Sequence, residues 1–232
     1  MTSGEQTLFH VAGILERLGL SWWLDQGTLL GLVRDGALLP WDSDIDLGVW
    51  SSDIERTRPV LVREMRREYN VTVRDEKIKA EPRDSEGLSI DLQIYRIEGE
   101  QAWTTLPVRR RRNFLLRKLR KPLSRRLDAI KDRVNNRLAH RRVPDEDREA
   151  PFDWLERLDH RISVLRTWIK TEPVLLSVDA RYYLEREWID VQGRRLPVPG
   201  RTEEYLAMKY GEDWRIPRRD WKYWRDDGAV QR

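Results

Sequence analysis

The sequence predicts a globular domain that mixes helices and strands, in an α/β or α+β arrangement, with one strongly basic helical insertion. Helical and strand-like patterns alternate over the first hundred residues, which is typical of a sheet covered by helices. Apolar residues form 39% of the 232 residues and eleven residues are Trp, so a real core is expected. Residues 109–142 contain 15 Lys or Arg and two Asp, a net charge of +13 against −9 for the remainder. The basic character therefore belongs to one segment.

Apolar residues spaced three or four apart mark the helices. The first helix places Leu8, Val11, Leu15 and Leu18 on one face, and Thr28 is the expected N-cap of the second. Helices are predicted over residues 7–20, 28–34, 53–69, 154–170 and 202–210.

Strands are predicted where β-branched, aromatic or alternating runs are bounded by turn residues. These runs cover residues 21–24, 44–50, 70–74 and 87–96. The alternation with helices places all four strands in one core over residues 1–106, and a helical carboxy-terminal part over residues 145–232 is expected to complete the same domain.

The insertion over residues 107–144 carries a leucine-rich stripe at helical spacing, and Pro122 is expected to kink or divide it. The stripe consists of Leu115, Leu119, Leu123, Leu127, Ile130, Val134 and Leu138. Two interpretations stay open: a solvated helical insertion, or a helix that brings residues 109–142 to an anionic membrane surface. Nucleic-acid binding is disfavoured because no recognition motif accompanies the charge.

Composition excludes several classes of chemistry. The chain has no Cys, which removes disulfides, thiolate catalysis and Cys-based zinc sites. Its three His residues are scattered without metal-ligand spacing. The amino terminus lacks a signal-peptide pattern, and no apolar stretch approaches the ~20 residues that span a bilayer. The expected location is the cytoplasm, with peripheral attachment to the inner face of the membrane as an option.

Two carboxylates in the predicted strand 44–50 carry the strongest functional signal. Asp44 and Asp46 are two residues apart, so their side chains point to the same face of the strand. Two neighbouring carboxylates repel each other, and a hard divalent cation such as Mg²⁺ relieves that repulsion while leaving positions for substrate phosphates. A small-residue turn, Gly27-Thr28-Leu29-Leu30-Gly31, precedes them and lets backbone N–H groups approach a phosphate. Metal and phosphate together indicate phosphoryl or nucleotidyl transfer.

These residues resemble a known family. The Gly27–Gly31 turn followed by Arg34, and then Pro40-Trp41-Asp42-Ser43-Asp44-Ile45-Asp46, resemble the LicD family, to which fukutin and fukutin-related protein belong. Pro197-Val198-Pro199, Tyr205-Leu206, Tyr210-Gly211 and Asp213-Trp214 resemble its carboxy-terminal signature. The matching blocks cover roughly residues 20–50, 88–96 and 196–214. Ser43 departs from the acidic residue that is common in the family.

The resemblance implies an α+β fold of the nucleotidyltransferase type, a mixed sheet with flanking helices. It also implies an Mg²⁺- or Mn²⁺-dependent transferase that moves a phospho-alcohol, such as phosphocholine or a polyol phosphate, from a CDP-linked donor to a hydroxyl of a glycan or lipid-linked glycan. The implied roles are metal binding and catalysis by Asp44, Asp46 and Asp91, and donor binding by Gly27, Thr28, Gly31 and Arg34.

Each role has a plainer alternative. Asp91 fits an exposed strand position, Arg34 a surface position, and the glycines a helix boundary. Asp42 is either a neighbour of the metal ligands or a turn residue. Tyr205, Tyr210 and Trp214 either pack in the core or line an acceptor site. The alternative activities are transfer of a nucleoside monophosphate to a sugar or small molecule, and a non-enzymatic, membrane-binding protein with a vestigial site.

Overall fold

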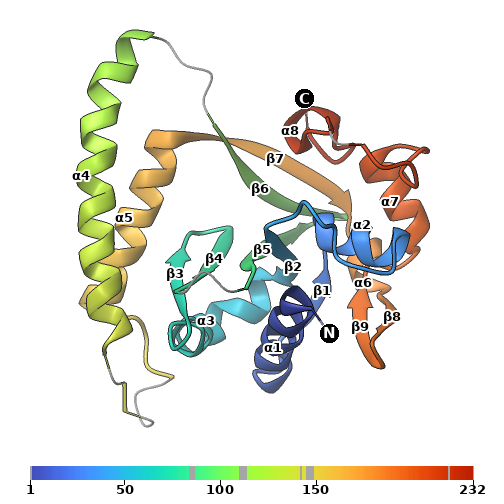
Figure 1. Cartoon of the computed structure of the whole chain (residues 1–232), viewed down its shortest axis with the longest axis horizontal. Coiled ribbons are helices and arrows are strands. Elements are labelled where there is room, and N and C mark those ends of the chain that lie inside the picture. The colour runs from blue at the N-terminus through green and yellow to red at the C-terminus, as the bar shows by residue number, and fades with distance from the viewer. Residues whose placement is uncertain are drawn as a thin grey trace.

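The computed structural model describes residues 2–83, 87–109, 114–141, 143–144, 149–218 and 220–231, and the side chains of residues 109–121 are not among the described ones. Within this part, seven strands form one mixed sheet with the central order β1-β2-β5-β4-β3, and β6 joins β5 to β7 (Figure 1). The strands are β1 (Trp22–Leu24), β2 (Asp44–Trp50), β3 (Tyr69–Val73), β4 (Lys77–Pro82), β5 (Ser89–Glu98), β6 (Gln101–Arg109) and β7 (Thr171–Asp179).

The centre of the sheet is the parallel pair β2 and β5, in which Asp46 lies opposite Asp91. The other strand pairs of this sheet are antiparallel, so the expected α+β fold with a mixed sheet is confirmed. Ile45 and Ile90, one residue before these aspartates, are fully buried. Side chains alternate along a strand, so the apolar residues fill the core on one face while the aspartates share the other face.

Three helices position β2. α1 (Ser3–Arg17) and α3 (Ser51–Met65) contact β2 and contribute apolar side chains to the main core. α2 (Gln26–Arg34) lies beside the start of β2. Its N-cap is Asp25, whose side chain accepts a hydrogen bond from Gln26 N, and not Thr28 as the sequence predicted. Asp25 precedes the turn, so the helix starts two residues earlier than the threonine signal suggested.

β6 and β7 form a long antiparallel ribbon that carries two antiparallel helices at one end of the molecule (Figure 1). They are α4 (Phe114–Ala139) and α5 (Trp154–Lys170). α4 continues through Pro122 as one helix, so of the two expected outcomes, a kink or a division, the division does not occur. A proline inside a helix costs about 3 kcal/mol. The later turns of α4 bury Leu127, Val134 and Leu138 against α5, which offsets this cost.

A buried ionic cluster attaches the α4–α5 pair to the rest of the chain. Asp159 of α5 accepts hydrogen bonds from Lys131 of α4 and from Arg66, which follows α3, with an Arg66 distance of 2.7 Å. Arg63 of α3 forms an ion pair with Glu156 of α5 at 2.7 Å. The basic insertion is thus a packed part of the protein in its described residues.

The carboxy-terminal region is not only helical. After β7, the described chain forms α6 (Arg181–Leu184), the hairpin of β8 (Glu187–Val191) and β9 (Arg194–Val198), α7 (Thr202–Tyr210) and α8 (Tyr223–Asp226). α7 and α8 lie beside the sheet at the end of the molecule opposite α4 (Figure 1). None of the helices within the described residues has the length and apolar character needed to cross a membrane.

Candidate active site

A cavity of about 850 Å³ lies between the start of β2, the start of α2 and the carboxy-terminal region. Its wall contains five acidic side chains and five basic ones. The acidic side chains belong to Asp25, Asp42, Asp44, Asp46 and Asp91. The basic side chains belong to Arg34, Arg74, Lys77, Lys79 and Arg218. This balance suits a ligand that brings anionic phosphates and a cation together.

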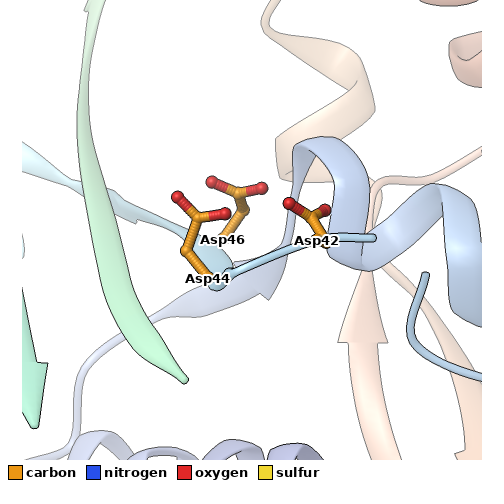
Figure 2. Close-up of side chains that lie close together, drawn as sticks. All are labelled: Asp42, Asp44 and Asp46. Atoms are coloured by element: carbon orange, nitrogen blue, oxygen red, sulfur yellow. The ribbon is translucent and has the colours of Figure 1, made fainter. Parts of the chain in front are cut away.

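Three of these aspartates converge at the start of β2. Asp42, Asp44 and Asp46 each offer a carboxylate oxygen, and the three oxygens lie within 4.8 Å of one another. Figure 2 shows the three side chains on the same side of the chain, Asp44 and Asp46 from β2 and Asp42 from the segment before it. We call these residues the carboxylate cluster. Oxygen ligands at this spacing suit a hard divalent cation.

The Gly27 region of α2 holds the carboxylate cluster. Gly27 N donates a hydrogen bond to Asp46 Oδ2 at 3.3 Å, and Asp46 N donates to Thr28 Oγ1 at 2.8 Å. A Cβ atom on Gly27 would overlap Asp42 Oδ2. Glycine at this position therefore lets α2 approach the cluster without displacing the Asp42 side chain.

A second, fully buried network of polar side chains stabilises the start of α2. Asp25 accepts hydrogen bonds from Tyr95 OH at 2.5 Å and Tyr205 OH at 2.8 Å. Near it, Lys209 and Asp227 form an ion pair at 2.7 Å in which both side chains are 0% exposed. Buried charges persist where they are paired and hydrogen-bonded. α7 and the chain after α8 thus help to fix the start of α2.

Electrostatics in the cluster favour a bound cation. Burial, followed by the charges of Asp91 and Asp42, raises the pKa of Asp44 from its usual 3.8 to about 7. Burial and the charges of Asp44 and Asp91 raise the pKa of Asp46 well above its usual range. Ionised carboxylates repel one another here, and a divalent cation reverses that effect. Asp91 Oδ1 is also buried without a hydrogen-bond partner. Both observations fit a site built for Mg²⁺ or Mn²⁺.

Asp91 lies beside the carboxylate cluster and is engaged by lysine. Its Oδ2 atom accepts from Lys77, and Lys79 Nζ lies 3.9 Å from Oδ1. Only 7% of the residue is exposed. The sequence placed Asp91 among the metal ligands, whereas Asp42 is the third member of the group defined by the 4.8 Å spacing. Asp91 contacts the same cavity and acts on Asp44 and Asp46 through its charge.

The residues expected to bind the donor lie in two environments. Gly27 and Arg34 line the cavity, and the Arg34 guanidinium is held by Asp35 through hydrogen bonds of 2.8 and 2.7 Å. Thr28 and Gly31 are not among the lining residues. Thr28 supports β2 as described above, and a Cβ on Gly31 would lie 2.7 Å from Ala37 O, so this glycine permits close packing of the following loop.

Several lining residues were not identified from the sequence. Lys77 and Lys79 lie two residues apart on β4, so both side chains point to the same face of the strand. This spacing could have located them only if residues 77–82 had been predicted as a strand. Arg74 and Arg218 carry no local motif. The aromatic part of the wall comes from the carboxy-terminal region: Tyr210, Trp214, Trp221 and Tyr223. Tyr210 and Trp214 thus line the cavity, whereas Tyr205 is buried beneath it.

Part of the chain is similar to known proteins. Residues 19–127 match the family described as LicD/FKTN/FKRP, nucleotidyltransferase domain. The ribitol 5-phosphate transferase FKRP of Homo sapiens is 45% identical over 49 residues, which are 21% of this chain and 10% of that protein. The ribitol-5-phosphate transferase FKTN of Homo sapiens is 37% identical over 51 residues, or 22% of this chain and 11% of that protein.

A bacterial relative shows the same likeness. The lipopolysaccharide cholinephosphotransferase LicD of Haemophilus influenzae is 35% identical over 63 residues, which are 27% of this chain and 23% of that protein. The aligned segments span between about a tenth and a quarter of these three relatives. The family match contains the carboxylate cluster, Gly27, Arg34 and Asp91. Residues 19–127 are therefore assigned to the nucleotidyltransferase domain of the LicD family.

Proposed function

We propose that this protein is a metal-dependent phosphotransferase of the LicD type. The observation that carries the proposal is the carboxylate cluster, which shares one cavity with five basic side chains. Carboxylates that hold a divalent cation next to Arg and Lys form the arrangement that phosphoryl transfer requires, because charge on the phosphate oxygens must be neutralised. The names of the relatives, a ribitol 5-phosphate transferase and a cholinephosphotransferase, point to the same class of reaction.

In this proposal the donor is a CDP-linked alcohol and the acceptor is a hydroxyl of a glycan or lipid-linked glycan. Asp42, Asp44 and Asp46 would hold Mg²⁺ or Mn²⁺, which when bound supplies neutralisation of the phosphate oxygens. Arg34 lines the cavity and is held by Asp35, and its remaining N–H donors would bind the diphosphate of the donor. Lys77 and Lys79 add positive charge beside Asp91.

Asp91 has two proposed roles: it completes the metal site and accepts the proton of the attacking hydroxyl. Its Oδ1 atom is buried and makes no hydrogen bond, so this oxygen has an open acceptor position. Its other oxygen is fixed by Lys77, which holds the carboxylate in one orientation. The aromatic residues Tyr210, Trp214 and Trp221 line the same cavity, where a nucleobase or an acceptor sugar would contact them.

A donor screen tests the proposal. Purified protein is incubated with Mg²⁺ and either CDP-choline, CDP-ribitol or each nucleoside triphosphate, and release of CMP or pyrophosphate is measured. CMP release from a CDP-alcohol, absent in Asp46→Asn, supports it. Pyrophosphate release from a nucleoside triphosphate would instead establish nucleotidyl transfer. Failure to bind or turn over any of these donors would favour a vestigial site.

A further inference from the structure

The outer side of α4 and α5 exposes apolar side chains along both helices. Leu123 and Ile130 of α4 and Trp154, Leu158 and Leu165 of α5 are between 39% and 70% exposed. Residues seven or eleven apart lie on nearly the same side of a helix, so each set forms one stripe. The inward sides of the two helices carry Lys131 and Asp159, which are buried toward β3.

Arginines share these two stripes. Helical spacing places Arg126, Arg133 and Arg137 beside Leu123 and Ile130, and Arg157 and Arg161 beside the apolar residues of α5; all five are exposed. We call these five arginines and the five apolar residues the outer face.

Acidic residues are absent from the outer face as far as the structure describes these two helices. Asp128 forms ion pairs with Arg166 and Lys170 between the helices, at 2.6 and 2.8 Å. Glu156 and Asp159 are buried on the inward side. Asp132 lies nine residues from Leu123, on the opposite side of α4. The outer face is therefore apolar and uniformly positive.

We propose that the outer face docks this protein on an anionic membrane surface. The outer face combines Trp and Leu with Arg, which is the composition of helices that lie at a membrane interface. The apolar side chains of such helices enter the headgroup boundary, while their cations contact acidic lipids. The long arginine side chains cover apolar surface and keep their charges at the lipid headgroups. This goes beyond the proposed phosphotransfer and does not depend on it.

Charge argues against a second copy of this chain as the occupant. A two-fold dimer places the same patch against itself. The outer face would then oppose arginine to arginine with no carboxylate between them, which is repulsive. An anionic bilayer complements the charge of every arginine on the face.

The surface differs from the one the sequence suggested. The leucine stripe was expected either to pack on the domain or to enter a bilayer, and three of its residues, Leu127, Val134 and Leu138, pack on α5. Arg109, Arg110, Arg111 and Arg112, the start of the basic run, have side chains that lie outside the described residues. The membrane contact is thus assigned to the outer face, beside the line along which α4 and α5 pack together. This face includes α5, which lies outside the basic run of residues 109–142.

Vesicle flotation of the full chain tests the proposal. The wild type should float with vesicles of phosphatidylcholine and roughly 30% phosphatidylglycerol at about 50 mM salt, and high salt should release it. Pure phosphatidylcholine should bind far less. Each Arg near an anionic surface contributes roughly fivefold in affinity, so Arg133→Glu/Arg161→Glu should weaken binding by roughly 25-fold or more. Leu158→Ser/Leu165→Ser should also weaken it.

The matched control is Arg125→Glu/Arg195→Glu, which makes the same charge change at exposed positions away from the outer face. Because both double variants change the net charge equally, the control should bind vesicles much more tightly than Arg133→Glu/Arg161→Glu. Circular dichroism should show that all variants are folded. The proposal would be overturned by no flotation of the wild type with acidic vesicles at low salt, or by equal loss of binding in Arg133→Glu/Arg161→Glu and in the control. A wild-type dimer that becomes monomeric in Arg133→Glu/Arg161→Glu would overturn it as well. Binding to single-stranded DNA with no vesicle binding would also overturn it.

Discussion

At the scale of single residues, Asp44 and Asp46 decide whether the cavity holds a cation. Replacing either carboxylate by the neutral amide keeps the shape of the side chain and removes a charged ligand. We expect Asp44→Asn and Asp46→Asn to lower turnover by ~10³-fold or more while the fold is retained, because several kcal/mol of transition-state stabilisation is lost. The measurement is CMP release by purified, folded variants. Asp132→Asn, an exposed position on α4, is the control. Near-normal turnover in either cluster variant would contradict the assignment.

Gly27 tests how closely α2 must approach the cluster. In Gly27→Ala the new Cβ would overlap Asp42 Oδ2, so Asp42 must move away from Asp44 and Asp46. A displacement of about 1 Å at a catalytic group costs roughly 10²-fold in rate, which is the expected loss of turnover. Gly13→Ala in α1 is the control, since its new Cβ meets only Arg17 Nη1, at 3.5 Å. Equal activity of the two variants would show that the close contact does not matter.

Proton and cation should compete for Asp44. With its pKa raised from 3.8 to about 7, the folded protein without metal keeps a proton that the unfolded chain has lost across this window. The free energy of unfolding in EDTA should therefore fall as the pH rises from about 4 to about 7. Mg²⁺ needs the ionised carboxylate, so it should raise the unfolding temperature more at about pH 8 than at about pH 5.5. Thermal unfolding with and without Mg²⁺ checks this, and Asp44→Asn should reduce the difference. An Mg²⁺ shift that is the same at both pH values would argue against a site at Asp44.

At the scale of elements, the α4–α5 pair depends on its buried ionic cluster. Asp159 is fully buried between Lys131 and Arg66. Asp159→Asn leaves both cations short of negative charge in the interior, and we expect the free energy of unfolding to fall by about 3–5 kcal/mol. Asp128→Asn removes a partly exposed pair between the same helices and should cost about 1 kcal/mol or less. Urea unfolding of the two variants measures the difference. Similar losses in both would show that the cluster contributes no more than a surface pair.

The elements that local pattern predicts are those with a clean period. β2 is predicted with its observed bounds, because Asp44 to Trp50 reads as a strand bounded by turns. β7 was not predicted, since Pro173 breaks the strand pattern. In the ribbon Pro173 lies opposite Pro107, beyond the residues at which β6 pairs with β5, where a missing N–H is tolerated. α4 shows the converse: Pro122 signals a break, and packing on α5 overrides it.

At the scale of the whole molecule, spacing in the sequence identifies those lining residues of the cavity that are close to one another in the chain. Asp42, Asp44, Asp46 and Gly27 are close in the chain, so a motif is enough to bring them together. Asp91 needed the family resemblance, because its proximity arises only from the parallel pairing of β2 and β5. Lys77, Arg218 and the aromatic wall reach the cavity through tertiary packing that no local pattern reports.

The carboxy-terminal region holds this site through buried polar contacts. Lys209 of α7 and Asp227 form a pair with 0% exposure, and Tyr205 of α7 donates to Asp25 at the start of α2. Lys209→Met leaves the buried carboxylate of Asp227 without its cation. The free energy of unfolding should therefore fall by about 3–5 kcal/mol. Lys209→Met/Asp227→Asn removes both charges and keeps an acceptor for Ala229 N, which Asp227 binds at 2.9 Å. The double variant should therefore be clearly more stable than Lys209→Met alone in urea unfolding. A double variant that is as unstable as Lys209→Met, or more so, would show that the two side chains are not coupled. Recovery of stability in the double variant would show that the stranded carboxylate, rather than lost packing, is what costs the single variant its stability.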